Sequence, residues 1–296
     1  MKIIAVTGGK GGTGKTTVAT NLAVYYSNMG YSVLLVDADV DGPNAAILLG
    51  GRYLDGDSAH ILLPKILLDK CIFCGKCAEV CLEHAIIQVG DKPPTLFQEI
   101  CNGCGACILV CPSKAINESY RELGKIYRHN LHNIKVLTGA LNPGEIRSQV
   151  VVQRLLERLD EEISTNNYDI VIIDTAPGTQ VMVSRVLYRV EYAVAVTEMT
   201  PLGLHDLNLL LTLARDLGVN CGIVVNRSDI QAIDISKLHE LSKKFSSRIL
   251  GEIPYDEYII KSTVEMTPVL IKYPDSPSSN AIKIIANEVL KELKLQ

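Results

Sequence analysis

The chain has 296 residues, of which 47% are hydrophobic, and its formal net charge at pH 7 is −4. This apolar content excludes an intrinsically disordered protein and allows one large α/β domain together with a small one. The acidic balance argues against non-specific binding to nucleic acid, and we expect no nucleic-acid partner. No apolar run approaches the roughly 20 residues that span a bilayer. The first residues enter a strand and a glycine-rich loop too early for a signal peptide, so we expect a cytoplasmic protein without a membrane span.

The first motif is a glycine-rich loop close to the N-terminus. An apolar run at 3–6 predicts a buried strand before it, and the apolar spacing at 18–26 predicts a helix after it. Residues 9–16 fit the pattern G-x-x-x-x-G-K-[ST], which in this context indicates a phosphate-binding loop. Glycines let successive backbone N–H groups surround the phosphates, and the helix N-terminus adds positive charge. The predicted nucleotide-binding residues of the loop are Gly9, Lys10, Gly11, Gly12, Thr13, Gly14, Lys15, Thr16 and Thr17.

Two of these residues have specific expected roles. Lys15 would reach the β- and γ-phosphates of ATP or ADP, and the Thr16 hydroxyl would bind Mg²⁺. A glycine-rich turn that binds nothing is the alternative, and the strand–loop–helix context argues against it.

The loop contains a second lysine, Lys10, which gives the form K-G-G-x-G-K-T. This form resembles the deviant Walker motif of the MinD/ParA/Mrp group of P-loop ATPases. The resemblance implies a doubly wound, mostly parallel α/β sheet, slow ATP hydrolysis and a homodimer with ATP bound, in which Lys10 touches the nucleotide of the partner subunit. A second lysine would stabilise charge as the γ-phosphate leaves, so Lys10 and Lys15 are both predicted catalytic residues. The alternative is that Lys10 is a solvated loop lysine.

Aspartates end two predicted strands at the sheet edge where parallel folds bind nucleotides. The stretch that begins at Asp37 reads D-A-D-V-D-G-P and resembles switch I of this family, and Asp174 opens D-T-A-P-G, which resembles switch II. The resemblance implies that Asp39 aligns the attacking water and that Asp37 and Asp174 help Thr16 to hold Mg²⁺. It also implies that the Gly178 backbone senses the γ-phosphate. An acidic turn that binds only water is the alternative for the first aspartates.

Two later strand ends are expected to surround the base. Asn226 and Arg227 lie at the end of the strand predicted at 219–226 and resemble the adenine-reading corner of the family, where an amide offers a donor and an acceptor together. Pro254 and Tyr255, after the last predicted strand, border the base in the same family. A final amphipathic helix at 280–293 is expected to pack on the sheet, because its polar face mixes charges and lacks the cationic character of a membrane-binding helix.

The second strong signal is cysteine spacing, since eight of the nine cysteines lie in two runs of the form C-x₂-C-x₂-C-x₃-C. The runs and their flanks repeat after 30 residues, which indicates an internal duplication. The spacing matches the bacterial two-cluster ferredoxin, in which the fourth cysteine of each run ligates the other cluster. On that resemblance, one [4Fe–4S] cluster is assigned to Cys71, Cys74, Cys77 and Cys111. The other is assigned to Cys81, Cys101, Cys104 and Cys107.

A pair of zinc sites is the alternative, but zinc usually takes its four ligands from two separated pairs. Since the α/β pattern resumes after the cysteines, we predict a ferredoxin-like α+β insertion at 58–120 within an ATPase domain at 1–57 and 121–296. The resulting hypothesis is a dimeric ATPase whose nucleotide state is coupled to electron transfer through two clusters, with a redox partner that the sequence does not name. One alternative is an Mrp-type iron–sulfur carrier with an acceptor protein. A positioning switch of the MinD/ParA kind is the other.

Overall fold

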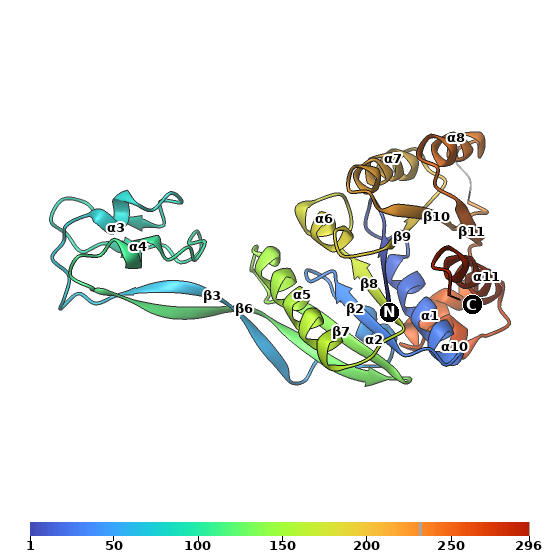
Figure 1. The fold of residues 1–296 in the computed structure, drawn as a ribbon, viewed down its shortest axis with the longest axis horizontal. Helices are drawn as coiled ribbons and strands as arrows, with labels where there is room; N and C mark the ends of the chain where they lie inside the picture. The colour runs from blue at the N-terminus through green and yellow to red at the C-terminus, as the bar shows by residue number, and fades with distance from the viewer. Residues whose placement is uncertain (231–232, 296) are drawn as a thin grey trace.

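The computed structural model describes residues 1–230 and 233–295, and within them nine strands form one sheet (Figure 1). These strands are β1 (Lys2–Thr7), β2 (Val33–Ala38), β3 (Gly56–Ile66), β6 (Ile116–Leu131), β7 (Ile134–Leu141), β8 (Ile170–Thr175), β9 (Tyr192–Thr197), β10 (Asn220–Asn226) and β11 (Ile249–Ile253). Their order is β11-β10-β9-β1-β8-β2-β7-β6-β3. All pairings from β11 to β7 are parallel, whereas β6 pairs antiparallel with both β7 and β3.

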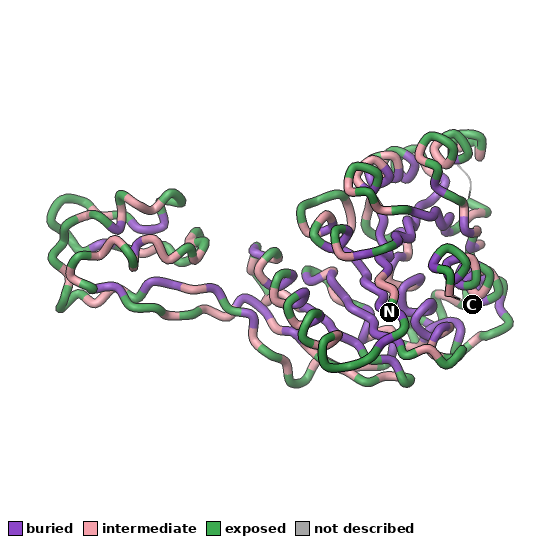
Figure 2. Tube along the Cα trace, in the orientation of Figure 1, coloured by how far each residue is buried: buried purple, intermediate pink, exposed green. Residues whose placement is uncertain are grey.

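Helices cover both faces of the sheet. They are α1 (Lys15–Asn28), α2 (Ala45–Leu48), α5 (Ser148–Thr165), α6 (Val181–Leu187), α7 (Pro201–Asp216), α8 (Ser236–Phe245), α9 (Glu257–Val264), α10 (Val269–Lys272) and α11 (Pro277–Glu292). One apolar core packs α5, α6 and α7 on one face, and a second packs α1, α10 and α11 on the other. Successive strand residues alternate between the two cores, so the central strands are buried on both sides (Figure 2). The predicted doubly wound, mostly parallel sheet is confirmed.

A capping residue sets the start of α7. This helix begins at Pro201, because the Thr200 hydroxyl accepts a hydrogen bond from the Gly203 N–H at 3.0 Å and caps the first turn. The expected C-terminal helix is α11, and its apolar side packs into the core as predicted. None of the helices in the described part of the chain has the length and apolar character that crossing a bilayer requires.

The ribbon formed by β3 and β6 extends beyond the sheet and carries the cysteines (Figure 1). At its end, residues 67–115 form a small unit, here called the cysteine module, with α3 (Lys76–Glu79), β4 (Ile86–Ile87), β5 (Thr95–Leu96) and α4 (Ala106–Leu109). Both β3 and β6 run without interruption through the predicted domain boundaries near 58 and 120. The strands that carry the module are therefore continuous with the edge of the main sheet.

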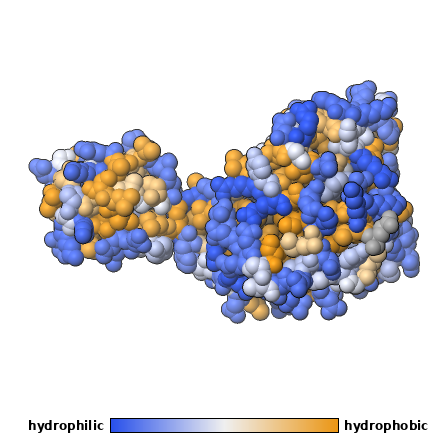
Figure 3. All heavy atoms as spheres, in the orientation of Figure 1, coloured by the Kyte–Doolittle hydropathy of each residue, from blue (hydrophilic) through white to orange (hydrophobic). Residues whose placement is uncertain are grey.

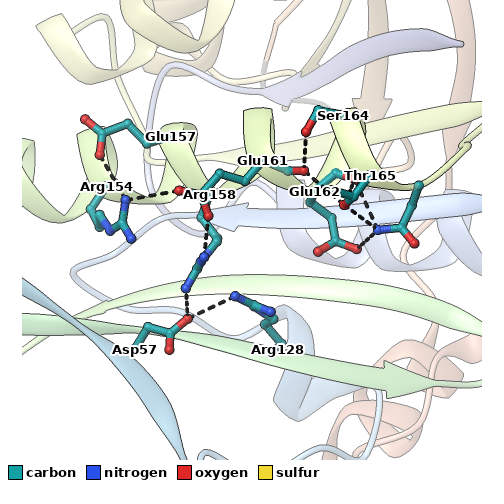
Figure 4. A network of polar contacts seen from close by, with 10 residues as sticks. Asp57, Arg128, Arg154, Glu157, Arg158, Glu161, Glu162, Ser164 and Thr165 are labelled. Atoms are coloured by element: carbon teal, nitrogen blue, oxygen red, sulfur yellow. Dashed lines mark hydrogen bonds and ion pairs between the residues drawn. The ribbon is translucent and has the colours of Figure 1, made fainter.

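The root of the ribbon is fixed to α5 by a charged network (Figure 4). Asp57 on β3 accepts hydrogen bonds from Arg128 on β6, at 3.1 Å, and from Arg158 on α5. The hydrogen bond from Arg158 is the main reason that the pKa of Asp57 lies below its usual value. Arg158 also pairs with Glu161, which pairs in turn with Arg154 at 3.4 Å. A connected network of this kind holds position better than an isolated surface pair.

Candidate functional site

The phosphate loop follows the carboxyl end of β1 and leads into α1, which begins at Lys15. Gly14, just before the helix, has φ +93°, in the left-handed region that favours glycine, and a Cβ atom there would overlap the Asn226 amide. The Lys15 side chain is buried and donates a hydrogen bond to the Lys10 carbonyl oxygen at 3.1 Å. Both the backbone conformation and the close packing therefore require glycine at position 14.

The two strand-ending aspartates lie side by side. Asp37 on β2 is the direct register partner of Asp174 on β8, and both are fully buried. The Asp37 carboxylate accepts hydrogen bonds from the backbone N–H groups of Asn44 at 2.9 Å, Ala45 at 2.8 Å and Asp39 at 3.2 Å. Asp37 thus holds the switch I segment against the start of α2. This structural role of Asp37 was not predicted from the sequence.

Burial dominates the electrostatics of these carboxylates. It raises the pKa of Asp37 to about 7, and the Asp39 charge adds to this rise. The backbone N–H groups that donate to Asp37 oppose the rise but do not cancel it. Burial, followed by the Asp37 charge, raises the pKa of Asp174 well above its usual value. Asp39 also has a raised pKa, because burial outweighs the opposing charge of Lys15. Burial lowers the pKa of Lys15 in turn, although Asp174 and Asp39 oppose this.

A divalent cation fits this arrangement. Neither carboxylate oxygen of Asp174 has a hydrogen-bond partner among the described residues. Thr16 and Lys15 lie near enough to favour the charged form of this carboxyl. A buried carboxylate without a partner is costly, and Mg²⁺ prefers oxygen ligands. Thr16 and Asp174 are thus brought together as the prediction requires, with Asp37 adjacent.

Lys10 is engaged within its own chain. Its Nζ lies 2.9 Å from Oε2 of Glu198, which directly follows β9 and whose side chain is 12% exposed. Arg227, which follows β10, forms an ion pair with the same carboxylate. Sequence reasoning missed Glu198, because a single glutamate after an apolar strand forms no motif. Its place at the carboxyl end of a parallel strand was the available signal.

The expected base-binding residues lie at the same edge of the sheet. The Asn226 amide is occupied by protein atoms, since it donates to the Thr13 carbonyl at 2.8 Å and accepts from the Arg227 N–H at 3.0 Å. Tyr255, which follows Pro254 after β11, is 51% exposed. Contact of these four residues with adenine stays a prediction.

The switch II segment touches the phosphate loop directly. The Gly178 N–H donates a hydrogen bond to the Gly8 carbonyl at 3.0 Å. Gly178 is thereby adjacent to the loop that the sequence predicts to hold the phosphates.

Residues 4–269 match the family model of the CobQ/CobB/MinD/ParA nucleotide binding domain. The chain belongs to this family. It is therefore a P-loop ATPase, and the prediction of a MinD/ParA-type ATPase domain is confirmed.

Individual relatives cover almost the whole chain. An uncharacterized protein of Methanocaldococcus jannaschii is 33% identical over 98% of both chains. An iron-sulfur cluster carrier protein of Aquifex aeolicus is 28% identical over 96% of this chain and 66% of its own length. Among solved structures, the cell division ATPase MinD of Pyrococcus furiosus has a TM-score of 0.62 and 23% identity. The match covers 98% of this chain and 99% of that one. MinD of Pyrococcus horikoshii, complexed with Mg-ADP, has a TM-score of 0.62 and 22% identity. The match covers 99% of this chain and 97% of that one. These two structures share the fold.

The cysteines of the module fall into two groups that line separate cavities. A cavity of about 240 Å³ has Cys81, Cys101, Cys104 and Cys107 in its wall. A narrower cavity of about 20 Å³ has Cys71, Cys74, Cys77 and Cys111 in its wall. Among the described residues, no group of three or more His, Cys, Asp or Glu side chains is arranged to hold a metal ion. The two groups of four correspond to the crossed ligand sets predicted above, and cluster ligation itself stays a prediction.

Backbone N–H groups are directed at two of the sulfurs. The Ala85 N–H donates to Cys81 Sγ and the Ala115 N–H donates to Cys111 Sγ, each at 3.2 Å. Although burial opposes it, donation from Ala115 helps to lower the pKa of Cys111. Burial raises the pKa of Cys107 to about 11. Donors aimed at sulfur favour the thiolate, which is the form that binds iron.

Large apolar side chains are exposed on the surface of the cysteine module. Leu82 and Leu109 are 91% and 87% exposed, and Figure 3 shows apolar residues gathered on the face of the module in view. Leu82 also lines the larger cysteine cavity. Exposed apolar surface of this kind marks sites of protein interaction.

Proposed function

We propose that this protein is a homodimeric, ATP-hydrolysing iron–sulfur protein, in which the nucleotide state controls electron transfer through two [4Fe–4S] clusters. The observation that carries the proposal is the division of eight cysteines into two groups of four, each lining its own cavity. The module that contains them is attached to the ATPase sheet through β3, which follows switch I and α2 in the chain, and through β6.

The nucleotide chemistry would follow the geometry at the sheet edge. Thr16, Asp37 and Asp174 would hold Mg²⁺, which when bound neutralises charge on the β- and γ-phosphates. Asp39 would orient a water molecule whose oxygen attacks the γ-phosphorus as the bond to the β–γ bridging oxygen breaks, giving ADP and phosphate. Lys15 would contact the transferring group in its own subunit.

Lys10 would act across the dimer interface on the nucleotide of the partner subunit. Its ion pair with Glu198 must break before it can cross. Asn226, Arg227, Pro254 and Tyr255 would surround the base. The Asn226 amide would have to exchange at least one of its present hydrogen bonds to read it.

In the cysteine module, the thiolates would bind the irons, and the bound clusters would supply one-electron redox chemistry. The N–H groups of Ala85 and Ala115 would stabilise the sulfurs of Cys81 and Cys111. The exposed apolar side chains near the larger cavity would contact a redox partner.

A second candidate is an iron–sulfur cluster carrier. It is favoured by relatives named iron-sulfur cluster carrier protein in Aquifex aeolicus and in Synechocystis, which are 28% and 26% identical to this chain. A carrier would release its cluster to an acceptor protein, whereas an electron-transfer protein would keep both clusters through turnover.

Iron counting and iron transfer separate these functions. Anaerobically purified protein should contain about eight irons per chain, the content of two [4Fe–4S] clusters. Labelled iron should then be lost to an apo-acceptor no faster than to a chelator. Faster transfer to the acceptor would favour the carrier, and a chain that binds no iron would refute both functions.

A further inference from the structure

Arg147 connects the ATPase domain to the second cysteine run. It directly precedes α5, and its guanidinium donates hydrogen bonds to the Cys101 carbonyl at 2.8 Å and to the Gln98 carbonyl at 3.5 Å. These acceptors are 46 and 49 residues away in the sequence and belong to the cysteine module. The contact ties the first cysteine of the second run to the start of a helix that packs on the sheet.

This contact is buried, and a carboxylate lies beside the guanidinium. Arg147 is 8% exposed, and its guanidinium also pairs with Glu145 at 3.1 Å. Glu145 forms a second ion pair with Arg121 on β6. A planar guanidinium that bridges two carbonyls and a carboxylate fixes their relative positions, which a lysine ammonium cannot do equally well.

The segment that holds Arg147 is hydrogen-bonded to switch I. At the end of β7, the Leu141 N–H donates to the carbonyl of Val40, the residue after Asp39, at 2.9 Å. The next residue, Asn142, donates to the Leu123 carbonyl of β6 at 2.8 Å, and the Glu145 N–H donates to the Asn142 carbonyl at 3.1 Å. Hydrogen bonds joined by short stretches of backbone thus lead from Val40, which follows the predicted water-aligning Asp39, to Cys101.

We infer that Arg147 is a positioning residue that transmits the nucleotide state of switch I to the loop of the second cysteine run. The inference rests on the proposed function, because it requires nucleotide to bind beside Asp39. Switch segments change conformation when the γ-phosphate is lost. A change at Val40 reaches Arg147 through Leu141 and Glu145, and alters how firmly Arg147 holds Cys101.

Hydrogen exchange measured by mass spectrometry on the full chain tests this inference. The probes are Mg²⁺ with ADP and Mg²⁺ with a non-hydrolysable ATP analogue, and the readout is exchange in peptides covering 97–107. In the wild-type protein the analogue should change exchange there by roughly fivefold or more relative to ADP, the lower end of typical allosteric couplings. In Arg147→Gln this nucleotide-dependent difference should disappear, while the variant still binds the analogue and its iron content stays at the wild-type value.

Three variants serve as controls. Arg147→Lys keeps the positive charge beside Glu145 but loses the planar guanidinium, so it should retain part of the nucleotide-dependent difference in exchange. Glu145→Gln should weaken the difference without removing the guanidinium, and it tests the same connection if Arg147→Gln fails to fold. Arg154→Gln, on the same helix and paired only with Glu157 and Glu161 among the described residues, should behave as wild type.

The outcomes distinguish the inference from the function on which it rests. If the wild-type protein binds the analogue but exchange at 97–107 is unchanged, or if Arg147→Gln keeps the full difference, the inference is wrong and the ATPase function stands. If neither nucleotide binds, the proposed function fails, and this inference fails with it. A difference lost equally in Arg154→Gln would also overturn the assignment to Arg147.

Discussion

The free energy of unfolding of Asp37→Asn, relative to that of wild type, should increase as the pH rises. The carboxyl of Asp37 is fully buried, and burial raises its pKa from the usual 3.8 to about 7. A carboxyl whose folded pKa exceeds its unfolded pKa contributes stability that is complete below the unfolded pKa. That stability is lost as the pH rises through the folded pKa. Asparagine does not titrate, so the variant escapes this loss.

The size of the effect follows from the two pKa values. A rise from 3.8 to about 7 corresponds to about 4 kcal/mol of lost stability above pH 7, at about 1.36 kcal/mol per pKa unit. About 3 kcal/mol of this loss falls between roughly pH 5 and pH 8. Loss of the Asp37 charge also relieves Asp174, whose pKa that charge helps to raise, and this acts in the same direction. The variant also loses stability because its hydrogen bonds with the N–H groups of Asn44 and Ala45 are weaker, and this loss is the same at every pH.

The assay is urea unfolding under anaerobic, nucleotide-free and Mg²⁺-free conditions across that pH range. The quantity compared is the free energy of unfolding of the variant minus that of wild type. Asp41→Asn, on the same loop but exposed, controls for the loss of one negative charge. Mg²⁺ with ADP should reduce the pH dependence of wild type, because the cation replaces the proton. A variant-minus-wild-type difference that does not change with pH would refute the reasoning.

Three further predictions concern the sites themselves. Lys15→Ala should weaken nucleotide binding, whereas Lys10→Ala should leave binding largely intact and abolish hydrolysis and ATP-dependent dimerisation. Calorimetry and light scattering check this, and identical behaviour of the two variants would remove the case for a lysine acting across the interface. Glu198→Gln should release Lys10 and lower the ATP concentration that dimerisation requires. The expected decrease is roughly fivefold, because a partly exposed ion pair contributes about 1 kcal/mol. The matched control is Glu191→Gln, which removes a surface pair with Lys2. Cys111→Ala should damage the cluster of the first cysteine run in electron paramagnetic resonance spectra, and an intact first cluster would exclude crossed ligation.

The phosphate loop and the parallel core could be predicted because their signals are local. The glycine pattern lies within ten residues, and the strand that ends at Asp174 is a continuous apolar run of the kind that parallel sheets bury on both faces. The cysteine runs are equally local, and their resemblance to the two-cluster ferredoxin was sufficient to propose the two groups that line the two cavities.

The antiparallel edge of the sheet, formed by β3 and β6, could not be predicted from local sequence patterns. Strand β6 contains few buried residues, among them Leu123 and Ile126, and much of the ribbon is partly or fully exposed (Figure 2). A ribbon of this kind has no clear alternation of apolar and polar residues. Glu198 and Arg147 were missed for a related reason, since their partners are remote in the sequence and depend on the three-dimensional fold.

The strand order offers a route by which the cysteine module would respond to the nucleotide site under the proposed function. β2 ends at switch I and pairs on one side with β8, which carries Asp174, and on the other with β7. The chain leaves this edge for the module through β3 and returns through β6, which pairs with β7. Because the Leu141 N–H is bonded to the Val40 carbonyl, switch I cannot move without either carrying the end of β7 with it or breaking that bond. Each alternative would change the support of the loop that presents Arg147 to Cys101, so under the proposed function the nucleotide state would reach the cysteine module through the sheet itself.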